Sequence, residues 1–243
     1  MSSPVDKSSS KPGSGWYFVV LNFTRYVFFG LLSGGIRVRG KENFPKDGPV
    51  IVAPNHISFI DPPVTACASP RAIGFMAKEE LFKPPVFVPL IRSLGAFPVK
   101  RGIGDKAAIS LAIDRLKDGQ SLLMFPEGTR GDGKTMRELQ SGVALVARRS
   151  GAKVVPAGIC GTHKMMPKGK SIPRFAKVTV VFGEPIAYAD FASRDEFNAA
   201  LRERLKAACA EAGLPLSDPA GIEDQASPET SGTEPSNPDP DQG

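Results

Sequence analysis

From Gly35 onward the chain alternates between two kinds of segment, and this alternation constrains its fold more than any other feature. One kind is short and rich in β-branched and aromatic residues, whereas the other has apolar residues that recur every three or four positions. The expected strands are residues 36–39, 50–53, 72–76, 96–99, 122–125, 154–159 and 178–182. Strands separated by helices connect by crossovers, so the pattern predicts an α/β fold: a single domain in which helices flank one mixed, largely parallel sheet.

Helical periodicity is clearest in three segments. Residues 105–117 carry apolar side chains at helical spacing and are followed by an Asp-Gly pair that stops the helix. Residues 136–150 show the same periodicity and end before Gly151. A last helix is expected from about Phe197 and is closed by Gly213.

Residues 16–33 form a dense aromatic stretch, and as a helix they would span about 27 Å. That length is slightly short of the ~30 Å hydrocarbon core of a bilayer. Arg25, near the middle, would cost about 2.5–3.5 kcal/mol to insert, and its presence argues against a signal peptide. A buried core helix is one interpretation. The preferred one is a membrane-associating helix, residues 16–34, that lies in or dips into one membrane face.

Charge is unevenly distributed along the chain. The net charge is +6, but residues 215–243 carry seven acidic side chains and no Lys or Arg, so the remainder carries +13. A body this basic predicts a polyanionic partner: nucleic acid, anionic lipid or a phosphorylated substrate. The acidic, proline-rich tail and residues 1–15 have too few large apolar side chains to fold. Both ends are therefore expected to be disordered, around an ordered domain of residues 35–214.

Metal or disulfide chemistry is not expected. The three cysteines, at positions 67, 160 and 209, are too few and too scattered for a disulfide framework or a metal cluster. The two histidines, His56 and His163, offer no metal-ligand set. A reducing compartment fits this cysteine usage.

Unusual polar residues follow three of the expected strands. They occupy residues 55–61 (Asn-His-Ile-Ser-Phe-Ile-Asp), 100–102 (Lys-Arg-Gly) and 126–130 (Pro-Glu-Gly-Thr-Arg). Because the carboxyl ends of parallel strands share one edge of a sheet, we expect these loops to meet there. Arg101 and Arg130 suit bidentate phosphate recognition. A tight turn with a solvated salt bridge is the alternative for the third loop.

His56 and Asp61 are the titratable pair in the first loop. In a continuous helix they would lie about 140° apart, so they can meet only if His56 is in the loop and Asp61 is near the helix start. Two helix starts compete: a capping-box-like Ser58-x-x-Asp61, or Asp61 as N-cap before Pro62. In either, the carboxylate could hold one imidazole nitrogen and leave the other free as a base. A structural histidine beside a capping carboxylate is the alternative, and it is favoured for an isolated pair.

Four ordered sequence blocks between about residues 40 and 185 change that balance. They are residues 55–61, 95–102 (Gly-Ala-Phe-Pro-Val-Lys-Arg-Gly), 125–130 (Phe-Pro-Glu-Gly-Thr-Arg) and 155–159 (Val-Pro-Ala-Gly-Ile). Together this stretch resembles the glycerolipid acyltransferases, in particular the bacterial 1-acyl-sn-glycerol-3-phosphate (lysophosphatidic acid) acyltransferases. Each block alone is a weak signal, but four in order with plausible spacing are a strong one.

The resemblance implies a reaction and a set of roles. The free sn-2 hydroxyl of lysophosphatidic acid would attack an acyl thioester, acyl-coenzyme A or acyl carrier protein, giving phosphatidic acid without any further cofactor. His56 would be the general base and Asp61 its orienting carboxylate. Substrate contacts are implied for Asn55, Ser58, Lys100, Arg101, Glu127, Gly128, Thr129 and Arg130. The expected location is the cytoplasmic face of the plasma membrane, with the membrane lipid surface as partner and no nucleic acid.

One departure from the family pattern leaves the acceptor open. Residues 139–142 read Leu-Gln-Ser-Gly where members often have an aromatic-Lys-x-Gly segment. Acceptor or donor preference is therefore in doubt, and a lyso-ornithine lipid or a lysophospholipid with a larger head group is the alternative acceptor. Gly158, where a small residue such as alanine is common, is treated as a tolerable variation.

Two other function classes compete. Gly102 and Gly104 fit a dinucleotide-binding G-x-G-x-x-A pattern between a strand and a helix, but this short pattern is frequent by chance. The basic stretch 160–177 would suit a nucleic-acid backbone, yet the aromatic residues cluster at the N-terminus rather than among these lysines. The same stretch also suits anionic lipid, an acidic carrier protein, coenzyme A or a solvated loop.

Overall fold

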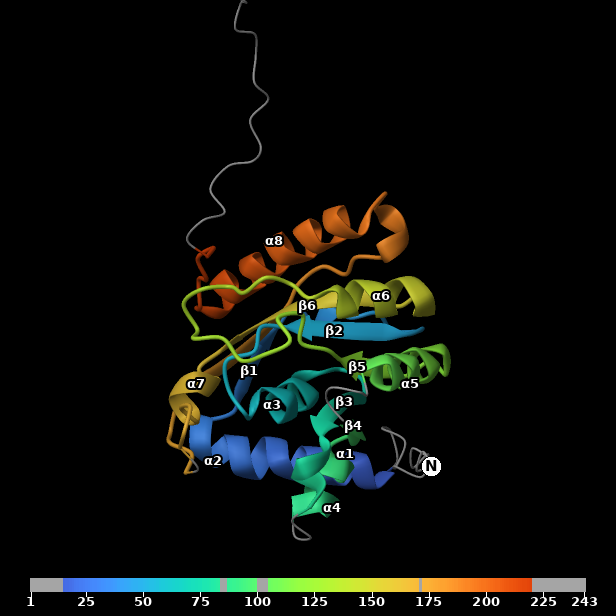
Figure 1. Ribbon diagram of the computed structural model, residues 1–243. Coiled ribbons are helices and arrows are strands. Elements are labelled where there is room, and N and C mark those ends of the chain that lie inside the picture. The colour runs from blue at the N-terminus through green and yellow to red at the C-terminus, as the bar shows by residue number, and fades with distance from the viewer. Residues whose placement is uncertain (1–14, 84–86, 100–104, 171, 220–243) are drawn as a thin grey trace, which may run out of the picture.

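The computed structural model describes residues 15–83, 87–99, 105–170 and 172–219, and in it a seven-stranded sheet forms the centre of the molecule (Figure 1). The strands are β1 (Ile36–Arg39), β2 (Val50–Pro54), β3 (Ile73–Lys78), β4 (Ala96–Val99), β5 (Ser121–Leu123), β6 (Lys153–Cys160) and β7 (Val178–Phe182). Their order is β1-β7-β6-β2-β5-β3-β4, and neighbours are parallel except the antiparallel pair β6 and β7. The predicted α/β fold is confirmed.

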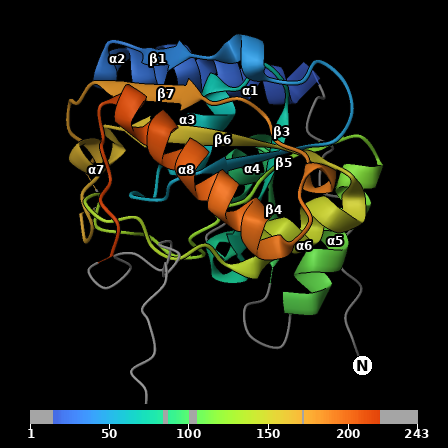
Figure 2. The same cartoon turned by 90° about the horizontal axis from the view of Figure 1, so that it is seen from above.

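Helices cover both faces of this sheet (Figure 2). They are α1 (Gly15–Phe23), η1 (Thr24–Phe28), α2 (Phe29–Ser33), α3 (Asp61–Ala68), α4 (Phe87–Ser93), α5 (Asp105–Lys117), α6 (Ser141–Ser150), α7 (Thr162–Met165) and α8 (Arg194–Ala212), with short 3-10 turns at Lys41–Asn43, Glu79–Phe82 and Tyr188–Asp190. β2 is buried throughout. Val50 and Val52 pack in a core with α1, α3 and α4, whereas Ile51 and Ala53 pack with α5, α6 and α8. Alternating side chains of one strand thus feed two separate cores.

The N-terminal segments α1, η1 and α2 form one helix of 19 residues with a mean hydropathy of 1.2, long and apolar enough to cross a membrane. Its buried side chains are Tyr17, Leu21, Thr24, Phe29 and Ser33. The five-residue step from Thr24 to Phe29 coincides with the π-helical η1, whose extra residue keeps both on one face. The Tyr17 hydroxyl accepts the Ile73 N–H at 3.1 Å, which ties this face to β3.

The opposite face of the same helix is apolar and exposed. It presents Trp16, Phe18, Val19, Phe23, Tyr26, Val27, Phe28 and Leu31. Lone apolar residues at a surface need no explanation, but a contiguous apolar helix face points to an interaction surface.

Helix α6 begins at Ser141, so the prediction of a helix from residue 136 is wrong over its first five residues. Residues 136–140 are extended instead: the Met136 N–H donates to the Ser217 carbonyl at 2.9 Å and the Gln140 N–H to the Pro126 carbonyl at 2.8 Å. Met136 is fully buried in a cluster with Leu205, Leu214 and Leu216. Contacts with a remote segment have overridden the local helical spacing.

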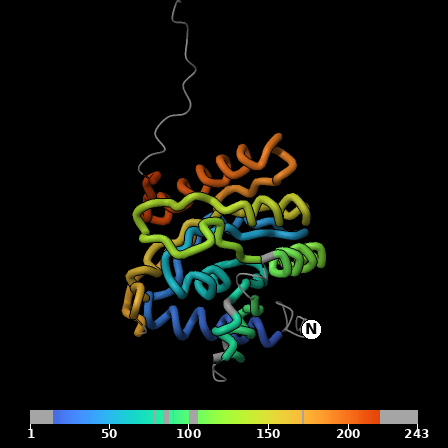
Figure 3. The backbone as a smooth tube through the Cα atoms, in the orientation of Figure 1, coloured from blue at the N-terminus to red at the C-terminus, as the bar shows by residue number. Residues whose placement is uncertain are grey.

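The ordered domain also extends past the predicted boundary at residue 214. Leu216 is buried, and the Ser217 N–H donates to the Lys134 carbonyl at 2.9 Å. Asp218 pairs with Arg202 and Lys206, each at 2.7 Å. Figure 3 shows these last described residues lying beside the loop that joins β5 to α6. Predictions for residues 1–14, for the tail from 220, and for Lys100, Arg101, Gly102 and Gly104 lie outside the described residues.

Candidate functional site

Asp61 holds His56 at the carboxyl end of β2. Asp61 is the first residue of α3 and fully buried, and its Oδ2 lies 2.9 Å from His56 Nδ1. The same oxygen accepts the N–H groups of Ile57 and Ser58, both at 2.7 Å. Because a carboxylate only accepts, Nδ1 carries the proton and Nε2 of the neutral ring is left as a base. The sequence-predicted pair is brought together.

The helix α3 begins at Asp61 with Ile60 as its N-cap, so neither predicted helix start is realised in full. The Ser58 N–H donates to Asp61, which is one half of a capping box. The Ser58 hydroxyl, however, donates to the Met166 carbonyl at 2.9 Å instead of capping α3, and Pro62 occupies the first turn. The amides of Ile57 and Ser58 are therefore occupied by Asp61 and are not free to bind a substrate oxyanion.

An aromatic ring fixes the plane of the imidazole. Phe125, just after β5, stacks on His56 with ring centroids 3.8 Å apart and an interplanar angle of 20°. Together with the Asp61 bond, this contact restrains the ring about both of its side-chain torsions. Phe125 was part of a predicted block, but no residue pattern indicated that it would face the histidine.

Asn55 and Glu127, both predicted to contact substrate, bind backbone groups in the structure. Asn55 is fully buried and exchanges two hydrogen bonds with Ile159 of β6, at 2.7 and 3.0 Å. Glu127 is also buried; its Oε1 accepts the His56 N–H at 3.1 Å and its Oε2 the Arg137 N–H at 3.3 Å. Both side chains, with Ser58, thus hold the histidine loop in place, and the substrate contacts of the three stay predictions.

Burial sets the electrostatics of Glu127. Removal from water raises the pKa of its carboxyl above the ordinary value, while the two backbone N–H donors lower that pKa and only partly offset the rise. A second tie supports the loop from the other side, where the Gly131 N–H donates to the His56 carbonyl at 2.7 Å. The loops after β2 and β5 are therefore joined by backbone-directed bonds.

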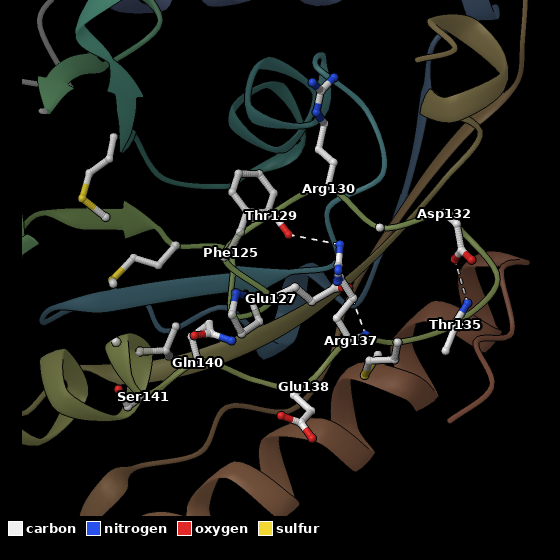
Figure 4. A pocket seen from close by; sticks show the side chains of 18 of the residues that line it. Phe125, Glu127, Thr129, Arg130, Asp132, Thr135, Arg137, Glu138, Gln140 and Ser141 are labelled. Atoms are coloured by element: carbon white, nitrogen blue, oxygen red, sulfur yellow. Dashed lines mark hydrogen bonds between the residues drawn. The ribbon is translucent and has the colours of Figure 1, made fainter. Parts of the chain in front are cut away.

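A cavity of about 1400 Å³ opens near His56 and Asp61, along the loop between β5 and α6 (Figure 4). Phe125 and Glu127 form part of its wall, so the cavity adjoins the His56 loop, although His56 does not itself line it. The predicted residues Gly128, Thr129 and Arg130 are exposed and do line it. Its other walls come from β3, β4, α5 and α6.

Arg137 is a cavity residue that the sequence analysis missed. Its Nη1 donates to the Thr129 hydroxyl at 3.3 Å, and Figure 4 shows its side chain on the same side of the loop as Thr129. With Arg130 and Lys168 it brings three cationic side chains to the cavity lining. The only indication of Arg137 in the sequence was its position just before residues 139–142, the segment that departs from the family pattern.

His163, the second histidine, lies near the buried carboxylate. It sits in α7, and the negative charge of Asp61 raises its pKa, but burial and the charge of Lys164 lower that pKa more. His163 is therefore neutral near pH 7. Within the described residues, no group of three His, Cys, Asp or Glu side chains is placed to hold a metal ion.

Close packing of α8 explains why position 158 is glycine, and the sequence did not reveal this. A Cβ at this position would lie 2.1 Å from the Ala208 carbonyl oxygen of α8, closer than any real contact. The helix therefore packs directly on the backbone of β6, and alanine could not replace Gly158 without moving α8.

Comparison with known proteins gives consistent matches. Residues 35–160 match the family model described as "Acyltransferase". The 1-acyl-sn-glycerol-3-phosphate acyltransferase of Bacillus subtilis is 32% identical over 182 residues, 72% of this chain and 88% of that protein. The lyso-ornithine lipid O-acyltransferase of Pseudomonas aeruginosa is 30% identical over 56% of this chain and 51% of its own. The crystal structure of the 1-acyl-sn-glycerophosphate (LPA) acyltransferase of Thermotoga maritima superposes with a TM-score of 0.70 and 33% identity, covering 80% of this chain and 78% of that one.

Proposed function

This chain belongs to the acyltransferase family, and from that premise we propose that it acylates the sn-2 hydroxyl of lysophosphatidic acid to give phosphatidic acid. The donor is an acyl thioester of coenzyme A or of acyl carrier protein. The names of the relatives from B. subtilis and T. maritima support the acceptor. The observation that carries the proposal is the His56–Asp61 pair, held at 2.9 Å beside a cavity with cationic side chains.

His56 acts as the general base. Its Nε2 takes the proton of the acceptor hydroxyl as the oxygen attacks the thioester carbonyl, because an alcohol is a poor nucleophile until a base removes that proton. The buried Asp61 carboxylate stabilises the imidazolium that forms. The thiolate then leaves as the tetrahedral intermediate collapses, and the enzyme needs no covalent intermediate of its own.

The cations of the cavity bind the acceptor phosphate. Arg130 is exposed on the loop after β5, and Arg137 and Lys168 lie in the same lining. A guanidinium presents parallel N–H groups that match phosphate oxygens, and such charge-assisted bonds are roughly twice as strong as neutral ones. Lys100 and Arg101, implied by the family resemblance, are proposed to contribute as well, although both lie outside the described residues.

The N-terminal helix associates with a membrane, at the cytoplasmic face of the plasma membrane. Its two faces differ: one is packed against α3 and α4, and the other exposes aromatic side chains. A helix that spans a bilayer alone presents every face to lipid, so the packed face supports a helix lying along one leaflet. There the exposed face meets lipid while the domain stays in water.

A second acceptor class has one observation in its favour. Gln140 lines the cavity where family members often carry a lysine, and its neutral amide removes one cation from phosphate recognition. A lyso-ornithine lipid lacks a phosphate, and the P. aeruginosa relative bears that acceptor in its name. The same His56 chemistry serves either acceptor.

The proposal is tested by acyl transfer with detergent-purified protein, acyl-coenzyme A or acyl carrier protein, and a panel of lysolipids. We expect phosphatidic acid from lysophosphatidic acid and a loss of about 10²–10⁴-fold in kcat for His56→Ala, the usual contribution of a general base. Thermal unfolding of the variant serves as the folding control. Product from lyso-ornithine lipid alone would replace the acceptor, whereas wild-type turnover by His56→Ala would refute the base.

A further inference from the structure

Exposed large apolar side chains are unevenly distributed over the described residues. Outside the N-terminal helix they are limited to Phe59, Ile172 and Phe175. Ile172 is 80% exposed, more than any large apolar side chain of that helix, and Phe175 at 67% matches Trp16 and Tyr26. Two large exposed apolar side chains within four positions are unusual for a loop that contacts only water.

A hydrogen bond attaches this loop, the described residues 166–170 and 172–177 (below, the 166–177 loop), to the N-terminal helix. The Ala176 N–H donates to the Leu32 carbonyl of α2 at 3.0 Å, next to the exposed Leu31. Figure 1 shows the loop below α7, beside the C-terminal end of α2. The exposed apolar side chains of the loop and of the helix therefore belong to neighbouring segments.

The same loop is joined to the His56 loop. The Arg174 N–H donates to the Met165 carbonyl at 2.8 Å, and the next carbonyl, that of Met166, accepts the Ser58 hydroxyl at 2.9 Å. Phe59, 42% exposed, follows Ser58 directly. A chain of contacts thus runs from α2 through the 166–177 loop to the segment that carries His56.

Charge identifies what this surface contacts. Residues 161–177 contain no acidic residue, and the exposed basic side chains among them are Lys164, Lys168, Lys170, Arg174 and Lys177. Basic residues that flank exposed apolar ones fit an anionic bilayer, which offers head-group charge above hydrocarbon. An acidic carrier protein would use the lysines but would leave Ile172 and Phe175 without a role.

We propose that the 166–177 loop is a second membrane-contact element, in which Ile172 and Phe175 enter an anionic leaflet and seat the His56 loop against the lipid surface. The proposal deepens the proposed function, on which it rests, because an acceptor that resides in the leaflet must reach His56 from there. The N-terminal helix supplies one line of contact, and this loop fixes the rotation of the domain about that line.

Tryptophan fluorescence of the full-length protein tests the insertion. Trp16 is the single tryptophan, so Trp16→Phe with Phe175→Trp leaves one reporter in the loop. The matched control combines Trp16→Phe with Ala210→Trp, at an exposed position on α8, which packs on the opposite face of the sheet. The probes are vesicles of phosphatidylglycerol and phosphatidylcholine, with and without a brominated phosphatidylcholine.

We expect a blue shift and bromine quenching for the reporter at 175 and neither for the one at 210. The proposal is overturned if the 175 reporter stays solvent-exposed on vesicles that sediment the protein, if both reporters are quenched alike, or if only acyl carrier protein changes its emission. It is equally overturned if no vesicle binds. Acyl transfer to lysophosphatidic acid in detergent, measured in parallel, reveals separately whether the proposed function itself has failed.

A charge comparison gives a second readout. Lys170→Ser with Arg174→Ser should weaken binding to phosphatidylglycerol vesicles about 25-fold, from roughly fivefold per basic residue near a charged surface. Arg148→Ser with Arg149→Ser removes the same charge from the exposed end of α6. This pair should weaken vesicle binding about threefold at most. Equal losses for the two pairs would show that only net charge matters and would contradict a specific contact.

Discussion

The loops that follow β2 and β5 meet at one edge of the sheet but treat their polar residues in opposite ways. After β2, Asn55, Ser58 and Asp61 are buried and bonded to backbone groups or to His56. After β5, Thr129 and Arg130 are exposed and line a cavity. The first loop holds the His56 ring in place, and the second presents cationic side chains to the cavity.

Glu127 belongs to the second loop by sequence but to the first by its contacts. Its carboxylate bonds the His56 N–H and is buried, unlike its neighbours Thr129 and Arg130. The difference teaches that a conspicuous acidic residue in a strand-end loop can be buried and bonded to the backbone of a neighbouring loop. The predictions below test this division.

The largest effect is expected for Asp61→Asn. All three N–H groups that Asp61 accepts meet the same oxygen, Oδ2, and Oδ1 has no hydrogen-bond partner among the described residues. An asparagine carbonyl can occupy the Oδ2 position, so the variant keeps the geometry and loses the charge. We expect kcat to fall by about 10³-fold or more, as when a triad carboxylate is neutralised. Kinetics with a matched thermal melt measure it, and near-wild-type turnover by a folded variant would contradict the orienting role.

Arg130→Ala should act mainly on acceptor binding. Loss of one charge-assisted bond to phosphate, about 1.5–3 kcal/mol, corresponds to a rise of about 10–100-fold in KM for lysophosphatidic acid. The kcat at saturating acceptor should change little, because the Arg130 side chain is exposed and forms no hydrogen bond with the described residues of the His56 loop. Steady-state kinetics against acceptor concentration separate the effects on KM and kcat. An unchanged KM with a lowered kcat would contradict a role for Arg130 in acceptor binding.

Glu127→Gln should instead lower kcat and leave the KM for the acceptor unchanged. A glutamine oxygen can accept only in one of the two positions, so one buried N–H, of His56 or Arg137, loses its acceptor. We expect the free energy of unfolding to fall by about 1–3 kcal/mol and kcat to fall about tenfold through a less restrained His56. Chemical denaturation and kinetics measure both. A raised acceptor KM with unchanged stability would return Glu127 to direct substrate contact.

Asp218→Asn is expected to have the smallest effect and a distinctive pH dependence. Hydrogen bonds from Lys206 and Arg202 hold the pKa of Asp218 below its ordinary value of 3.8. A lowered folded-state pKa contributes stability at neutral pH, and that contribution disappears as pH falls through the folded-state pKa. The variant should lose about 0.2–1 kcal/mol at pH 7, as for exposed ion pairs. The difference from wild type in melting temperature should begin to shrink near the ordinary pKa of 3.8 and vanish only below the lowered folded-state pKa, whereas a constant difference would exclude the ion pairs as its cause.

The sequence by itself determined the sheet and the pairing of His56 with Asp61, because both depend on local patterns. β-rich runs alternating with helical ones specify an α/β sheet whatever the loops do, and the strand bounds differ from prediction by a few residues at most. His56 and Asp61 are five residues apart, so one turn at a helix start brings them together.

Only the tertiary structure decided which polar residues serve the backbone and where the ordered chain ends. The partners of Glu127, Asn55 and Ser58 lie 71, 104 and 108 positions away in the sequence. The early start predicted for α6 and the early end predicted for the domain failed together, because the Met136 N–H donates to the Ser217 carbonyl and the Ser217 N–H to the Lys134 carbonyl. Local propensity differs by fractions of a kcal/mol per residue, and a buried side chain with a bonded backbone outweighs it. Such partners exist only once the sheet has formed.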